Sequence, residues 1–168
     1  MGREHPPHGC RCNLGAAGRA LRRGIAAVSA RQGLHASCVA LDPDRAVLIL
    51  GASGSGKSSL ALELMARGAQ LVADDRVDLR QEGAALWASA PQTIVGKIEA
   101  RGVGILNARA LAGARVTLCV DLDQRESERL PPQRSSFLLG VSLPLLHNTG
   151  TAAFPAAILQ YLREGRFA

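Results

Sequence analysis

The residues with the clearest chemical potential form a glycine-rich run, GASGSGKS, at positions 51–58. It satisfies G-x-x-x-x-G-K-[ST] and lies between an apolar segment and a stretch with helical spacing, as a phosphate-binding loop must. Glycines let backbone N–H groups face a phosphate, and the following helix points its positive dipole end at the anion. A lysine adds a mobile charge, and the serine hydroxyl suits Mg²⁺. We therefore predict that ATP and Mg²⁺ bind here, through Gly51, Ala52, Ser53, Gly54, Ser55, Gly56, Lys57 and Ser58.

Two adjacent aspartates, Asp74 and Asp75, end the next apolar segment, AQLVA. If this segment is a parallel neighbour of the strand before the loop, both strands end at one edge of the sheet and the aspartates face the loop. One carboxylate could then bind Mg²⁺ through water while the other accepts a hydroxyl proton. The alternative is a cap or turn, since aspartate is common where strands end. Asp121, which ends the apolar segment VTLCV, fits the same pattern equally well.

The elements that must position these residues interleave along the chain. We expect strands over 34–42 and 46–52, joined by a turn at Asp42-Pro43-Asp44-Arg45, and then a helix from Lys57 to a cap at Gly68. A strand over 69–75, a hairpin over 76–89 about Glu82-Gly83 and a central strand over 114–123 follow. We expect a loop over 130–136, one or two strands over 137–146, and a helix over 155–163. This order predicts an α/β domain with a mixed sheet over residues 34–168.

Residues 1–33 have a different composition and are expected to form a flexible N-terminal extension. The formal charge is +6, and residues 1–31 hold six arginines and one glutamate, or +5, which leaves +1 for residues 32–168. Within the extension, residues 16–30 could form a basic amphipathic helix. The residues His5, His8, Cys10 and Cys12 could bind a metal, although a flexible leader is the favoured interpretation.

Composition also excludes several classes of partner. No aromatic stacking platform accompanies the positive charge, so a nucleic-acid partner is not expected. The apolar runs are far shorter than the roughly 20 residues of a membrane-spanning helix, so no membrane partner is expected. The scattered cysteines form no disulfide framework, which favours a reducing cytoplasm.

Three blocks, in this order, resemble the catalytic domain of bacterial HPr kinase/phosphorylase in its short form, which lacks the usual N-terminal domain. They are GASGSGKSSLAL, RGAQLVADDRV and IEARGVGILN, and the last is similar to the family signature E-x-R-G-[LIV]-G. The resemblance covers about residues 34–165 and implies a phosphoenolpyruvate-carboxykinase-like P-loop fold in a single domain. It implies ATP-dependent phosphorylation of a serine on the phosphocarrier protein HPr, phosphorolysis as the reverse activity, and a hexamer as a candidate assembly.

The resemblance also implies roles for individual residues. His35 stands where the family has its histidine before the loop, and Lys57 takes the loop role. Asp74 would deprotonate the acceptor serine with support from Asp75, and Ser58 and Glu99 would hold Mg²⁺. Arg129 resembles a family arginine that serves the reaction. The signature block contributes Glu99, Arg101, Gly102, Gly104 and Asn107.

Two other functions stay open from the residues alone. A small-metabolite kinase would combine the same loop with arginines and an acidic residue near the acceptor hydroxyl. A regulatory module would bind ATP without turnover, an alternative favoured by Ser59, which stands where the family commonly has an acidic residue. A transporter ATPase is excluded, because the chain is too short and lacks the L-S-G-G-Q signature.

Overall fold

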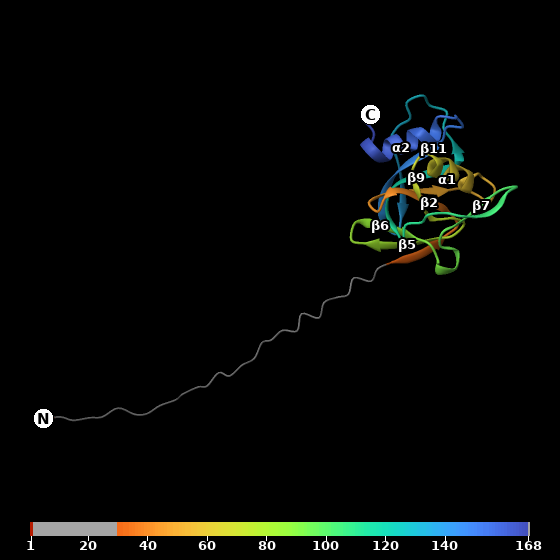
Figure 1. Cartoon of the computed structure of the whole chain (residues 1–168). Helices are drawn as coiled ribbons and strands as arrows, with labels where there is room; N and C mark the ends of the chain where they lie inside the picture. The colour runs from red at the N-terminus through yellow and green to blue at the C-terminus, as the bar shows by residue number, and fades with distance from the viewer. Residues whose placement is uncertain (2–29, 168) are drawn as a thin grey trace.

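The computed structural model describes residue 1 and residues 30–167. Most of the expected extension, including His5, His8, Cys10, Cys12 and the predicted helix up to residue 29, lies outside the described residues. Between residues 30 and 167 the chain folds into a nine-stranded mixed sheet, a two-stranded sheet and two α-helices (Figure 1). Neither of these described helices is long and apolar enough to cross a membrane.

The large sheet runs in the order β1-β5-β6-β9-β3-β2-β4, and β11 and β10 extend it from β9. Pairing is parallel between β3 and β9 and between β9 and β11, and antiparallel elsewhere. The strands are β1 (Arg31–Leu34), β2 (Ser37–Asp42), β3 (Arg45–Leu50), β4 (Gln70–Ala73), β5 (Val77–Glu82), β6 (Ala85–Ser89), β9 (Ala114–Arg125), β10 (Arg134–Leu138) and β11 (Val141–Asn148).

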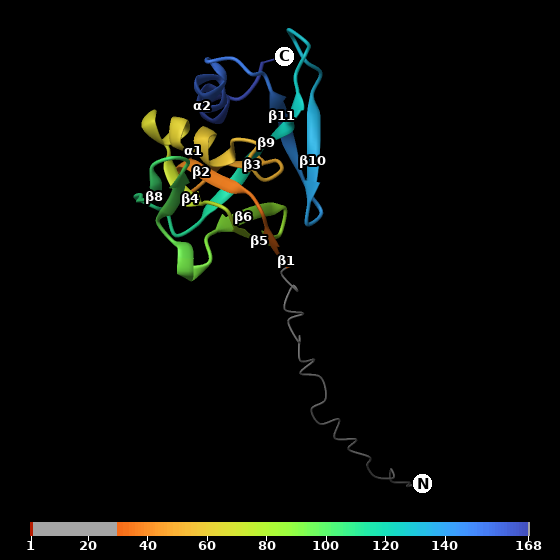
Figure 2. The same ribbon diagram turned by 90° about the vertical axis from the view of Figure 1, so that its right-hand side faces the viewer.

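Both helices, α1 (Lys57–Ala66) and α2 (Phe154–Glu164), cover the same face of the sheet (Figures 1 and 2). Successive side chains of a strand point to opposite faces, so Val47 and Ile49 of β3 pack against the helices. The intervening Leu48 belongs to the core on the other face, which the β5–β6 hairpin and β11 cover. The expected α/β domain with a mixed sheet is confirmed, with two cores rather than one.

Strand β9 is central, as its apolar sequence predicts. One edge pairs with β3, and the other pairs first with β6 and then with β11. Leu48 of β3 is flanked in register by Cys119 of β9 and by Cys38 of β2. Burial raises the pKa of the Cys38 thiol well above its usual range and that of Cys119 to about 12, so both stay protonated in the core.

Several local predictions are confirmed. Helix α1 ends as expected, because Gly68 adopts a left-handed φ of 102° and its N–H donates to the Met65 carbonyl at 3.0 Å. The β5–β6 hairpin turns at Gly83, and the closing helix lies over residues 154–164.

Two expected elements are wrong in their bounds. The strand expected over 34–42 is two strands: Leu34 ends β1, His35 lies at the break, and β2 begins at Ser37. Strand β1 also brings Arg31–Gly33 into the sheet by pairing with β5, although these residues were expected to belong to the extension. At the break between the two strands, the His35 imidazole contacts the Asp75 carbonyl oxygen.

The loop expected over 130–136 is also too long, because β10 begins at Arg134. A two-residue turn at Leu139-Gly140 closes the β10–β11 hairpin, with φ of 49° and 79°. Left-handed φ at both positions matches the turn that favours tight hairpins, but leucine is an unusual residue there. The usual Asn-Gly or Asp-Gly signal is therefore missing from the sequence.

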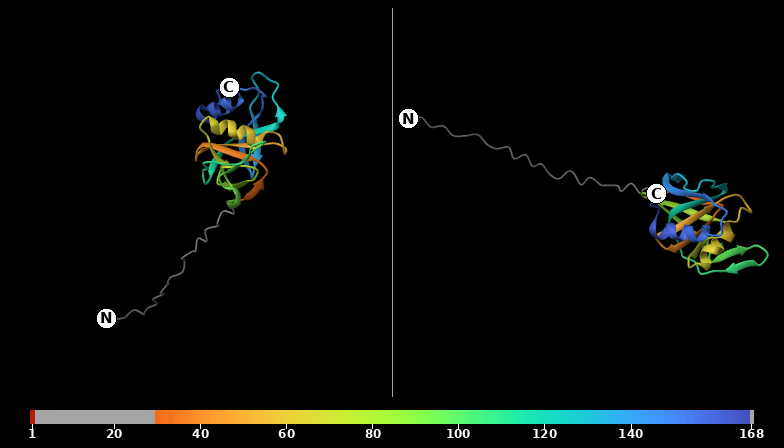
Figure 3. Two further views of the ribbon diagram at one scale, coloured as in Figure 1. Left: turned by 45° about the vertical axis from the view of Figure 1, so that its right-hand side comes forward. Right: turned by 90° about the horizontal axis from the view of Figure 1, so that it is seen from above.

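A small second sheet carries the third sequence block. It follows the short 3₁₀ helix η1 (Gln92–Ile94) and pairs β7 (Lys97–Ala100) with β8 (Gly104–Asn107), and it projects from the body (Figure 3). Ile98 is 1% exposed and anchors the hairpin in the helix-side core, while Val103 and Ile105 are 75% and 73% exposed. The hairpin is thus fixed at its base and open at its tip.

Candidate functional site

The loop and most of the predicted site residues surround one cavity of about 230 Å³. It lies where β3 ends and α1 begins, and the turn end of the β7–β8 hairpin completes its wall. The lining residues are His35, Ser53, Gly54, Gly56, Lys57, Ser58, Ser59, Asp75, Glu99 and Arg101.

The loop has the backbone that its glycines predict. Gly51, Gly54 and Gly56 have φ of 144°, 82° and 98°, a region that side-chain-bearing residues rarely adopt. At Gly51, an added Cβ would lie only 2.5 Å from Ser55 Oγ. Glycine at this position therefore allows the loop to close tightly on itself, and the N-terminus of α1 begins directly after it.

Lys57 lies across the loop. Its side chain is buried, with 6% exposed, and Nζ donates to the carbonyl oxygens of Gly51 and Ala52 at 2.8 Å each. The ammonium therefore lies inside the curve of the loop, next to the cavity that it lines. A phosphate placed there would offer it a charged acceptor, and charge-assisted hydrogen bonds are the stronger kind.

Asp74 is buried behind the cavity and is not one of the residues that line it. Its Oδ1 accepts hydrogen bonds from the hydroxyls of Ser37 at 2.5 Å and Ser58 at 2.9 Å. Its Oδ2 accepts from the backbone N–H of Glu99 at 3.0 Å. Both oxygens of this carboxylate are thus used within the protein.

Asp75 has the opposite surroundings. Its side chain is 78% exposed and lines the cavity, and its φ of 65° is left-handed. His35 Nδ1 donates to the Asp75 carbonyl oxygen at 2.8 Å and lies 3.2 Å from Oδ1 of the same residue. The donation fixes the proton on Nδ1, since a carbonyl oxygen can only accept.

The strand that leads to these aspartates, β4, is not a neighbour of β3, contrary to the sequence-based argument. β2 lies between them and is antiparallel to both. Two antiparallel steps make β4 parallel to β3, so the two strands still end at the same edge. The expected position of the aspartates is therefore confirmed, by a different arrangement.

The signature block supplies two side chains to the cavity, Glu99 from β7 and Arg101 from the turn of the hairpin. Arg101 Nη2 lies 3.7 Å from where a Cβ on Gly54 would be, so the guanidinium reaches the loop. Gly102, in the turn, and Gly104, the first residue of β8, have positive φ of 80° and 130°. Asn107 pairs with Lys97 at the base of the hairpin, away from the lining residues.

The end of β9 also reaches the loop, through a residue that the sequence analysis did not select. Both carboxylate oxygens of Asp123 accept from the backbone N–H of Ala52, at 3.0 and 2.8 Å. Asp121, the residue that was considered, accepts instead from the N–H of Asp123 at 2.9 Å. The alternation VDLD offered a signal, because residues two apart in a strand lie on the same face.

Arg129 is not brought into the site: among the described residues, those that line the cavity do not include it. It lies in the connection between β9 and β10. Ser37 is the other residue that sequence reasoning missed. Its only signal was a polar residue, two positions after His35, in an otherwise apolar strand.

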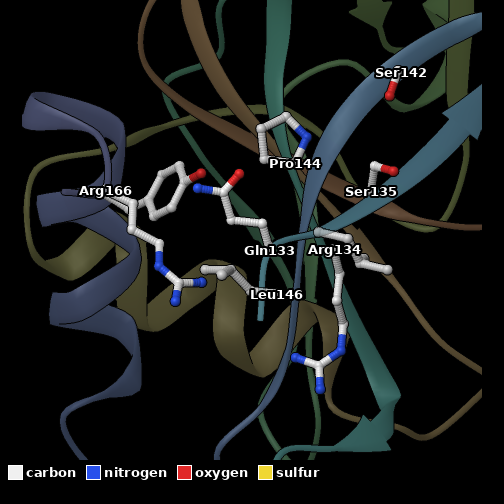
Figure 4. Close-up of a pocket in the computed structure, with 9 residues that line it drawn as sticks. Gln133, Arg134, Ser135, Ser142, Pro144, Leu146 and Arg166 are labelled. Carbon is white, nitrogen blue, oxygen red and sulfur yellow. The ribbon is translucent and has the colours of Figure 1, made fainter. Parts of the chain in front are cut away.

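A larger cavity of about 390 Å³ lies between the β10–β11 hairpin and α2 (Figure 4). Two arginines line it, but both bind within the fold: Arg134 to Glu126 at 2.6 Å, and Arg166 to the Pro131 carbonyl. None of the predicted site residues lines this cavity. The smaller cavity is therefore the better candidate for the predicted chemistry.

The residues of the smaller cavity fit ATP and Mg²⁺. The left-handed glycines, the N-terminus of α1 and Lys57 form a cradle suited to phosphate oxygens. Ser58 and Glu99 add a hydroxyl and a carboxylate on the same wall, and Mg²⁺ prefers such oxygen ligands. Every predicted ligand of ATP and Mg²⁺ except Gly51, Ala52 and Ser55 lines the cavity, and those three belong to the same loop.

Comparisons with known proteins all match this chain to HPr kinases. The family model described as the HPr serine kinase C-terminal domain matches residues 26–132. The HPr kinase/phosphorylase of Geobacillus thermodenitrificans is 42% identical over 113 residues, which cover 60% of this chain and 37% of that protein. The enzyme of the same name from Brevibacillus brevis is 54% identical over 69 residues, which cover 40% of this chain and 22% of that protein.

A solved structure gives a broader match. The Hpr(Ser) kinase/phosphatase from Coxiella burnetii superposes with a TM-score of 0.65 at 29% identity, over 79% of this chain and 88% of that one. The matched region spans less than two fifths of the length of the curated relatives described above.

Proposed function

This chain belongs to the HPr serine kinase C-terminal domain family, and we propose that it is an ATP-dependent kinase for a serine of an HPr-like phosphocarrier protein. The observation that carries the proposal is the cavity that joins the phosphate-binding loop to an exposed carboxylate, Asp75, held by His35. Phosphoryl transfer requires both parts side by side: one for the nucleotide, and one for the hydroxyl that attacks it.

The loop binds and orients the nucleotide. Its backbone N–H groups and the N-terminus of α1 face the phosphates, and Lys57 supplies the positive charge. Ser58 and Glu99 would hold Mg²⁺. When bound, ATP would supply the phosphoryl group and Mg²⁺ would neutralise part of its charge. Arg101, which reaches Gly54, adds a second cation to the cavity.

We assign proton transfer to Asp75 rather than to Asp74, the residue that the sequence analysis favoured. A base must reach the acceptor hydroxyl, and Asp75 is exposed in the cavity whereas Asp74 is buried with both oxygens occupied. Asp75 accepts the serine proton as the serine oxygen attacks the phosphorus. His35 holds the Asp75 backbone so that the carboxylate stays in place.

The reverse reaction uses the same group. If inorganic phosphate attacks phosphoserine, the protonated Asp75 returns its proton to the leaving serine oxygen. Phosphorolysis and a hexameric assembly, expected from the family resemblance, and a cytoplasmic location, expected from the scattered cysteines, form part of this proposal. Arg129 would join the site only if the segment between β9 and β10, which carries it, lay beside the cavity.

The proposal is tested by incubating the purified protein with Mg·ATP and an HPr protein and measuring serine phosphate by mass spectrometry. We expect transfer by the wild type and its loss in Asp75→Asn. ATP consumption with sugars or hydroxy acids and no protein acceptor would support a small-metabolite kinase instead. ATP binding without transfer to either acceptor would support the regulatory module.

A further inference from the structure

We propose that Ser37 is a positioning residue that acts through Asp74 to hold Ser58 and Glu99 in place for Mg²⁺. The inference rests on the proposed function for the identity of the metal site, and on hydrogen bonds within this chain for everything else. Ser37 lies at the start of β2, is fully buried, and is not among the residues that line the cavity.

The geometry of the Asp74 carboxylate carries the argument. It joins four segments of the chain: the start of β2 through Ser37, the first turn of α1 through Ser58, the end of β4 through itself, and β7 through the Glu99 N–H. Two of the four segments provide the proposed metal ligands. Whatever fixes this carboxylate therefore fixes the distance between those ligands.

The direction of each hydrogen bond explains why the orientation matters. The hydroxyl of Ser58 donates its proton to Asp74, so its lone pairs point elsewhere, and Ser58 lines the cavity. The Glu99 N–H donates to Asp74, and the Glu99 side chain lies on the exposed side of β7 and lines the cavity. Asp74 thus orients both groups. In many metal sites, a hydrogen-bond partner of the ligands, which does not itself contact the metal, has the same role.

Ser37 in turn holds Asp74. It donates to the same oxygen, Oδ1, that accepts from Ser58, at the shorter distance of 2.5 Å against 2.9 Å. His35 and Ser37 are two residues apart, and each holds one aspartate: His35 binds Asp75, and Ser37 binds Asp74. The residues at the start of β2 therefore order both aspartates: Asp75, which accepts the proton, and Asp74, which orients the metal ligands.

The test uses Ser37→Ala, Asp74→Asn and the double variant, with Thr117→Val as the matched control. Thr117 donates a hydroxyl hydrogen bond to the Ala46 carbonyl at the other end of β3, away from the cavity. Two quantities are measured for each: the Mg²⁺ concentration for half-maximal binding of a non-hydrolysable ATP analogue, and the exchange rate of the Glu99 amide without nucleotide.

For Ser37→Ala we expect the half-saturating Mg²⁺ concentration to rise about 3- to 10-fold, less than the roughly 10- to 100-fold seen when a direct partner of a metal ligand is removed, because Ser37 acts through Asp74. We expect the Glu99 amide to exchange faster, and binding at saturating Mg²⁺ to be unchanged. Because Ser37 acts through Asp74, adding Ser37→Ala to Asp74→Asn should have no further effect.

The opposite results overturn the proposal. It fails if Ser37→Ala matches Thr117→Val in both measurements, or if its effect adds in full to that of Asp74→Asn. Ser37→Ala alone decides the matter if Asp74→Asn does not fold. A wild type that binds the Mg·nucleotide but phosphorylates no HPr would refute the kinase proposal and leave this one standing, so the two failures are distinguishable.

Discussion

Two strands parallel to β3 bring acidic residues to the same edge of the sheet, and the two apolar segments fitted the pattern equally well until the family resemblance favoured Asp74-Asp75. Strand β4 ends in the adjacent pair Asp74-Asp75, and β9 carries Asp121 and Asp123, two residues apart. The first pair divides: one carboxylate is buried behind the cavity, and the other is exposed within it. In the second pair, Asp123 accepts from the Ala52 N–H at the start of the phosphate-binding loop, and Asp121 accepts from the Asp123 N–H.

The difference follows from the local backbone. Asp74 and Asp75 come directly after β4, and the left-handed φ of 65° at Asp75 turns the chain there, so one side chain lies in the interior and the other in the cavity. Asp121 and Asp123 lie within β9, where residues at i and i+2 share a side, and Asp121 contacts the backbone of Asp123 instead of the ligand site. Acidic residues at the end of a strand therefore indicate a site, while the backbone around them decides which of them can reach a substrate.

The strongest test of this comparison is Asp75→Asn. We expect the rate of phosphoryl transfer to fall about 10²- to 10⁴-fold, because the amide cannot accept the serine proton. Asparagine tolerates the left-handed backbone, so folding should be preserved. The affinity for the ATP analogue, measured by titration, should stay within about twofold, since the loop provides that binding. A loss of affinity equal to the loss of rate would contradict the role.

Asp74→Asn should have the next largest effect, of a different kind. An amide keeps one oxygen acceptor but replaces the other oxygen with an NH₂ group, which cannot accept. That group would face either the two serine hydroxyls or the Glu99 N–H. We expect kcat/KM at limiting Mg²⁺ to fall about 10- to 100-fold, with partial recovery at high Mg²⁺. Steady-state kinetics over a Mg²⁺ series measure this. A rate that does not respond to Mg²⁺ would return Asp74 to the role of base.

Asp123→Ala should have a smaller effect that is confined to the nucleotide. The Ala52 N–H would lose its side-chain acceptor, but water can replace it because Asp123 is exposed. We expect the KM for ATP to rise about three- to tenfold with little change in kcat, as for a contact that only orders the loop. A fall in kcat without a change in KM would place Asp123 in the chemical step.

Asp121→Ala should have the smallest effect. It removes one hydrogen bond to the exposed backbone of Asp123, and the KM for ATP should change by about twofold or less. Asp121→Ala and Asp123→Ala are compared in the same kinetic assay, and each is the control for the other. If Asp121→Ala has the larger effect, the assignment of the two residues is reversed.

The sequence predicted the parts of the site that lie close together along the chain. The phosphate-binding loop needs a strand, glycines and a helix in immediate succession, and all three are visible within residues 46–66. The signature block was identified as a contiguous motif, although the hairpin that it forms was not predicted. The central strand and the closing helix were predicted from their apolar patterns for the same reason.

The sequence did not predict contacts between distant segments. Ser37 and Asp74 are 37 residues apart, and Ala52 and Asp123 are 71 apart. Neither contact leaves a local pattern, so the buried and exposed aspartates could not be distinguished. The β10–β11 hairpin was misplaced because its turn, Leu139-Gly140, lacks the residues that usually mark one.

The left-handed backbone at Asp75 narrows the choice of residue more than the chemistry does. Asp, Asn and Gly adopt this conformation at little cost, and of these only Asp carries an ionisable group. Glutamate offers the same acid but would strain the backbone and place its carboxylate one methylene further from His35. An aspartate-for-glutamate exchange, usually considered conservative, is therefore a severe change at this position.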